Sequence, residues 1–149
     1  PDATKEEMEA VLQKVNLLGF LQTQDGLQTQ LLEKASNLSG GQCQRLVIAR
    51  ALLKEDSKVY IFDEAASNID VESEELIMNV IHNLAKTKTV LLISHRLANV
   101  VKSDKIYFLK DGEIKESGKH EELMSQNGAY RHLYESQMAL ENYGKGGVA

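Results

Sequence analysis

The sequence is poor in several features that would each indicate a particular class of protein. It contains a single cysteine, Cys43, so no internal disulfide can form and a reducing compartment is expected. No apolar run approaches the roughly 18 residues of a membrane-spanning helix, and no signal peptide is recognised at the start. The net charge is -5 and no basic block occurs, which argues against a nucleic-acid partner.

The composition is otherwise that of an ordinary globular domain. Hydrophobic residues make up 42% and charged residues 26% of the 149 positions, which argues against wholesale disorder. The length suits one domain. The chain starts at Pro1, its only proline, without an initiator methionine. We therefore expect it to be a piece of a longer protein.

Short apolar runs alternate with amphipathic stretches, and this pattern predicts an α/β fold. The runs at 59–62 and 90–93 predict two buried strands, and Asp70 predicts the start of a helix between them. Thr4 and Glu7 have capping-box spacing at the start of a predicted helix that ends at Gly19. Further predicted elements are a turn and short helix in 20–37, a helix over 40–54, a short helix over 97–101, a tight hairpin over 106–115, and helices over 120–125 and 130–139.

Polar side chains follow both predicted core strands, where parallel sheets form their ligand crevices. Asp63 and Glu64 end the first strand; the former could hold Mg²⁺ and the latter could activate water as a base. The pair could also be two solvated acids. His95, after the second strand, could bind a phosphate as a neutral imidazole, or could be a surface or capping histidine.

A second candidate site opens the helix predicted over 40–54. Gly40 and Gly41 let another group approach the backbone, and the free N–H groups of a first helical turn favour an anion. The hydroxyl of Ser39 could add a donor. Ser39 could also be a plain N-cap that follows an ordinary loop.

The order of these segments resembles that of ABC-type ATPases. Residues 38–45, Leu-Ser-Gly-Gly-Gln-Cys-Gln-Arg, resemble the family's signature motif, and 59–64 resemble its Walker B strand with the trailing glutamate. Residues 65–70 resemble the D-loop, and 94–96, Ser-His-Arg, resemble the switch-histidine loop. The segment 120–134 is similar to the end of exporter-type members, in which the ATPase domain follows a membrane domain.

The sequence also departs from the family pattern. Ala66, Asn68 and Ile69 differ mildly from the usual D-loop, and Cys43 stands where arginine is usual. No Gly-x-x-x-x-Gly-Lys-Ser/Thr motif, the Walker A phosphate cradle, occurs anywhere in the chain. The resemblance therefore implies a partial ABC ATPase fold, inactive on its own, with parallel core strands flanked by helices and a helical signature subdomain.

The resemblance implies a role for each candidate residue at an ATP sandwiched between two nucleotide-binding domains. Asp63 would hold Mg²⁺ through water, Glu64 would polarise the attacking water, and His95 would contact the γ-phosphate. Asp70 would bridge to the opposite subunit. At the partner's ATP, Ser39 and Gly41 would touch the γ-phosphate and Gln42 would lie near the ribose, with Gly40 also among the cofactor-binding residues.

The implied protein is an ATP-hydrolysing ABC exporter at the cytoplasmic face of the cell membrane. Its cofactors would be ATP and Mg²⁺. Its partners would be a second nucleotide-binding domain, identical or not, a membrane domain on the same full-length chain and the missing N-terminal half of the ATPase domain. The expected divisions are a helical signature subdomain portion over 1–57, the C-terminal part of the ATPase core over 58–140 and a disordered tail over 141–149.

Two other interpretations fit part of the same pattern. Chromosome-maintenance and DNA-repair ATPases carry the same motifs in a C-terminal lobe and their Walker A in a distant one. Against this interpretation, no heptad segment precedes the signature and the chain is acidic. A naturally P-loop-less regulatory module is the other alternative, and the intact Glu64 and His95 argue mildly against it.

Overall fold

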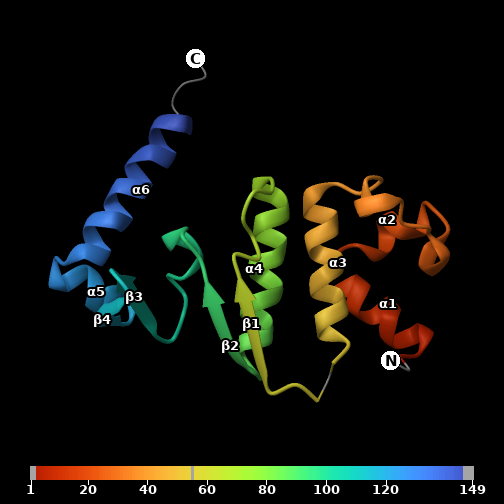
Figure 1. Cartoon of the computed structure of the whole chain (residues 1–149), viewed down its shortest axis with the longest axis horizontal. Coiled ribbons are helices and arrows are strands. Elements are labelled where there is room, and N and C mark those ends of the chain that lie inside the picture. Colours follow the sequence, from red (N-terminus) through yellow and green to blue (C-terminus); the bar gives the residue numbers. More distant parts are fainter. Residues whose placement is uncertain (1–2, 55, 146–149) are drawn as a thin grey trace. The chain divides into compact units, whose positions relative to one another are not determined.

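The computed structural model describes residues 3–54 and 56–145, which form two compact units that meet in sequence between Ile93 and Ser94 (Figure 1). Each unit is described by itself. Among the described residues, no helix is both long and apolar enough to cross a membrane.

The first unit is a helical layer followed by a parallel β-α-β element. Its two strands, β1 and β2, pair in parallel with Val59 opposite Thr89 and Asp63 opposite Ile93. This arrangement confirms the predicted α/β class with parallel core strands flanked by helices. The elements in chain order are α1 (Lys5–Lys14), α2 (Leu18–Gln22), η1 (Gly26–Gln28), η2 (Glu33–Ala35), α3 (Gly40–Leu52), β1 (Val59–Asp63), α4 (Val71–Ala85) and β2 (Thr89–Ile93).

One hydrophobic core joins the helices of this unit to one face of its sheet. Tyr60 and Phe62 point from β1 into the core, where they join Ile77 and Ile81 of α4. Val59 and Ile61, on the opposite face, are 56% and 65% exposed. The prediction that both strands are buried was therefore wrong. Side chains alternate along each strand, so only one face of β1 is covered, and β2 has half-buried and exposed residues but no buried one.

The predicted helix over 4–19 is interrupted. Thr4 and Glu7 form the expected capping box, but α1 ends at Lys14. Asn16 adopts a left-handed conformation with φ 52°, which asparagine tolerates better than most residues, and Leu17 is fully buried beyond it. The predicted stop at Gly19 was wrong, because the chain turns three residues earlier and Gly19 lies within α2.

The second unit pairs a hairpin with two helices. The strands β3 (Ile106–Lys110) and β4 (Glu113–Gly118) are antiparallel, and they follow η3 (Leu97–Asn99). Asp111 and Gly112 both have positive φ, as the predicted tight turn requires. The hairpin is followed by α5 (His120–Gln126) and α6 (Ala129–Lys145).

The long helix α6 is held at its start by a carboxylate from the hairpin. Glu116 Oε1 accepts a hydrogen bond from the Ala129 N–H at 2.5 Å, and a Cβ on Gly128 would lie 2.5 Å from that oxygen. Tyr130 is fully buried, and its hydroxyl lies 2.9 Å from His120 Nδ1. The helix runs on to Lys145, so 141–145 are not the disordered segment that was predicted; residues 146–149 of that segment lie outside the described residues.

Candidate functional site

The segment Ser39–Gln42 forms the start of α3 through a complete capping box. Ser39 Oγ accepts a hydrogen bond from the Gln42 N–H at 3.2 Å, and Gln42 Oε1 accepts one from the Ser39 N–H at 2.8 Å. Ser39 is thus an N-cap, as its simpler interpretation held. A hydroxyl that accepts one hydrogen bond still has a proton to donate, so capping does not exclude contact with a ligand.

The two glycines of this segment lie in different surroundings. A Cβ on Gly41 would lie 2.5 Å from Ser73 Cβ and 3.3 Å from Asp70 Oδ2, so this glycine is required by the packing of α3 on α4. A Cβ on Gly40 would meet only Ile69 Cγ2, at 4.0 Å. The close approach predicted for both glycines is therefore made at Gly41 by a neighbouring helix, whereas Gly40 leaves space beside the backbone.

Asp70 caps α4 next to the start of α3. Its Oδ1 accepts a hydrogen bond from the Ser73 N–H at 2.8 Å, and this bond is the main reason why the pKa of Asp70 lies below its usual value. The charge of Arg45 lowers the pKa further. The contacts at Gly41 place the two helix N-termini side by side, and Figure 1 shows α3 and α4 as neighbours. The structure thus brings Ser39–Gln42 and Asp70 together.

The two acidic residues predicted at the end of β1 differ in exposure and in backbone conformation. Asp63 ends the strand and is exposed, whereas the half-buried Glu64 has a left-handed backbone with φ 51°. The Glu64 N–H donates to the Ile93 carbonyl at 3.0 Å, and its own carbonyl accepts from the N–H and the hydroxyl of Ser67. A left-handed backbone in a residue other than glycine costs about 1 kcal/mol or more, and these bonds hold it in place.

The donor set at this strand end suits Mg²⁺ better than a metal enclosed by protein ligands. Asp63 supplies an exposed carboxylate, and the described ranges 3–54 and 56–145 contain no group of three or more His, Cys, Asp or Glu side chains that could hold a metal. Mg²⁺ commonly takes one or two carboxylates and fills its other positions with water and substrate phosphates. The residues present therefore fit such an ion.

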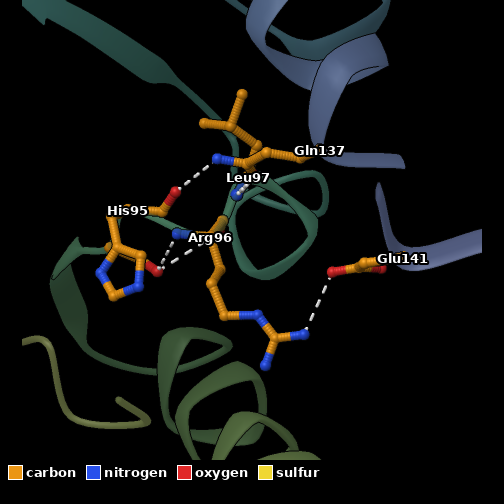
Figure 2. A network of polar contacts seen from close by, with 6 residues as sticks. His95, Arg96, Leu97, Gln137 and Glu141 are labelled. Atoms are coloured by element: carbon orange, nitrogen blue, oxygen red, sulfur yellow. Dashed lines mark hydrogen bonds and ion pairs between the residues drawn. The ribbon is translucent and has the colours of Figure 1, made fainter. Parts of the chain in front are cut away.

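His95 belongs to the second unit, where its backbone is part of a polar network that reaches α6 (Figure 2). Sequence reasoning missed this network, because Gln137 lies 42 positions along the chain from His95. It also missed Ser73 and Arg45. The Nε of Arg45 is buried and has no hydrogen-bond partner within the described part of the chain. No local pattern marks Ser73, and Arg45 ends the signature-like segment 38–45 without a role having been assigned to it.

Comparison with known proteins identifies the family. The ABC transporter family profile matches residues 3–67. The chain is 51% identical, over 94% of its length, to an ABC transporter ATP-binding protein of Haemophilus influenzae, and 45% identical, over 90%, to an ATP-dependent lipid A-core flippase of Mannheimia succiniciproducens. It spans only 25% and 23% of these two relatives.

A solved structure supports the same assignment. The structure of a bacterial Atm1-family ABC exporter with ATP bound superposes with a TM-score of 0.82 at 31% identity, covering 91% of this chain and 24% of that one. These relatives are transporters and flippases, so the chromosome-maintenance alternative is not favoured. The chain belongs to the ABC transporter family and corresponds to part of the ATP-binding domain found in ABC exporters.

Proposed function

We propose that the chain is part of the ATP-hydrolysing motor of an ABC exporter, acting at the cytoplasmic face of a membrane. The complete protein would join this domain to a membrane domain and pair it with a second nucleotide-binding domain. The observation that carries the proposal is the signature-like segment Ser39–Gln42, which opens a 13-residue helix beside the N-terminus of α4. The relatives named as ATP-dependent flippases support it.

The start of α3 would receive the γ-phosphate of an ATP that is bound mainly by the second domain. The helix dipole places about half a positive charge there, which favours an anion. Ser39 can donate its hydroxyl proton, and Gly40 leaves the backbone accessible. Gln42 keeps its amide N–H groups for the ribose, because only its Oε1 is used by the capping box.

The end of β1 would carry the chemistry of hydrolysis. Asp63 would hold Mg²⁺ through water, and the ion when bound would neutralise charge on the phosphates. Glu64 would orient and polarise the attacking water. Glu64 lies just beyond the last residue of β1, where its left-handed backbone departs from the extended strand, and it is half-buried whereas Asp63 is exposed. The two carboxylates can thus perform separate tasks.

His95 and Asp70 would each have a separate role toward ATP. The imidazole of His95 would contact the γ-phosphate from its own domain. Asp70 would bridge to the opposite domain, and its exposed position at the first turn of α4 leaves its carboxylate accessible to a partner. Only Oδ1 of Asp70 receives the hydrogen bond from the Ser73 N–H, so Oδ2 can accept another.

Glu64→Gln in the complete transporter tests this function. ATP binding should persist, because the amide keeps the shape of the carboxylate. Hydrolysis should fall about 10²–10⁴-fold, the usual cost of losing a general base. Glu75→Gln, the same change at an exposed position of α4, should leave the rate unchanged. A Glu64→Gln rate within a few-fold of the parent would reject the role of Glu64 as the base.

A further inference from the structure

The backbone of His95 is held by a glutamine from the far end of the sequence. Gln137 Nε2 donates a hydrogen bond to the His95 carbonyl at 2.8 Å, and Gln137 Oε1 accepts one from the Leu97 N–H at 2.9 Å. Figure 2 shows the Gln137 side chain reaching from α6 to both groups. A single side-chain amide thus bridges two backbone groups that flank Arg96, as a neighbouring β-strand would.

The same loop is also held from its own side. Ser94 Oγ accepts a hydrogen bond from the Arg96 N–H at 3.1 Å and lies 3.3 Å from the Arg96 carbonyl, to which its proton is donated. Leu97 is buried, which fixes the exit of the loop. The peptide that follows His95 is therefore restrained by Ser94 on one side and by Gln137 on the other.

An ion pair lies one helical turn further along α6. Glu141 Oε1 is 3.1 Å from Arg96 Nη2, and the two side chains are 38% and 37% exposed. Residues 137 and 141 are four apart, so both lie on the face of α6 that contacts the loop. Partly exposed ion pairs contribute little, whereas Gln137 satisfies two backbone groups in a fixed geometry. Gln137 is thus the stronger restraint.

We propose that Gln137 is a positioning residue for His95. The inference rests on the proposed function, in which the imidazole contacts the γ-phosphate. Neither hydrogen bond of Gln137 uses the imidazole ring, so Gln137 acts through the backbone from which the ring projects. A misplacement of about 1 Å at a catalytic group can cost roughly 10²-fold in rate, so such a backbone restraint has a kinetic consequence.

Gln137→Met in the complete transporter tests the proposal. Methionine keeps the length of the side chain and is a good helix former, but it removes both hydrogen bonds. We expect kcat for ATP hydrolysis to fall about tenfold and KM for ATP to stay within about twofold, because the proposed contact of His95 with the γ-phosphate supplies only a small part of ATP binding. Gln126→Met, the same change at an exposed glutamine of α5, is the matched control and should change neither constant.

A second background separates positioning from general stability. In His95→Ala, the residual hydrolysis measured with radiolabelled ATP should fall less than about twofold when Gln137→Met is added, because the positioned ring is already absent. A tenfold fall in that background would overturn the proposal, because Gln137 would then act independently of His95. An unchanged kcat in Gln137→Met alone would overturn it too.

Hydrogen exchange of the Leu97 amide reports the contact without using activity. In Gln137→Met the Leu97 N–H loses its acceptor and should exchange about tenfold faster, whereas Gln126→Met should leave it unchanged. Unchanged exchange in Gln137→Met would overturn the proposed contact. The exchange difference could also be seen in a protein whose ATP hydrolysis does not depend on Glu64. That result would confirm the contact of Gln137 but overturn the proposed function, and the positioning role of Gln137 with it.

Discussion

Gly41→Ala should destabilise the protein even though alanine is the better helix former. The new Cβ would lie 2.5 Å from Ser73 Cβ and 3.3 Å from Asp70 Oδ2, and Ser73 is buried. Overpacking of this kind costs about 1–3 kcal/mol, and displacing the Asp70 cap adds up to roughly 1 kcal/mol. The helix-propensity gain of about 1 kcal/mol offsets only part of this cost. The expected net effect is a loss of up to about 3 kcal/mol.

The adjacent glycine supplies the control. Gly40→Ala adds a Cβ that meets only Ile69 Cγ2 at 4.0 Å, so it should be neutral or stabilise by up to about 1 kcal/mol. Urea unfolding followed by circular dichroism at 222 nm measures both changes. Ser73→Gly should recover part of the Gly41→Ala loss, because it removes the atoms that clash. A Gly41→Ala midpoint at or above that of the parent would refute the argument that α3 and α4 touch here.

Two further predictions concern the chain itself and Asp70. The isolated 149-residue chain, which contains no Walker A motif, should show no ATP turnover above background; turnover that disappears on Glu64→Gln would contradict this. The hydrogen bond from Ser73 lowers the pKa of Asp70 in the folded protein. The ionised Asp70 therefore stabilises the fold fully above the pKa that it has in the unfolded chain, and this stabilisation is lost as the pH falls through the lower pKa of the folded state. Asp70→Asn keeps a capping residue and should reduce the change of urea midpoint between about pH 4 and pH 2; an unaltered pH dependence would show that the cap carries no such effect.

The sequence predicted the elements that are determined by interactions between residues close together in the chain. The strand predicted over 59–62 is β1 at Val59–Asp63, and the one predicted over 90–93 is β2 at Thr89–Ile93. The capping box at Thr4, the cap at Asp70 and the turn at Asp111 were also correct. Each of these depends on residues that lie within a few positions of one another, so a single sequence contains the information.

Features that depend on distant contacts were not predictable in this way. The helix predicted to end near Ala139 runs on to Lys145 as α6, and no glycine or proline occurs in 140–143 to stop it earlier. The clash that requires Gly41 arises from Ser73, 32 residues away, and the restraint on His95 arises from Gln137. Sequence analysis named Gly41 and His95, but the residues that contact them could not be identified without the fold.

The electrostatics of the two adjoining helix N-termini explain why a phosphate would bind at one and not the other. At α4 the dipole is already met by the carboxylate of Asp70, which accepts the Ser73 N–H at 2.8 Å. At α3 the capping group is the neutral hydroxyl of Ser39, and the Asp70 carboxylate lies beside the helix rather than on its cap, 3.3 Å from the position of a Cβ on Gly41. An incoming anion therefore gains more at Ser39–Gln42 than at Asp70, where it would meet a like charge. The same comparison leaves the negatively charged Asp70 suited to accept a hydrogen bond, as the bridging role proposed for it requires.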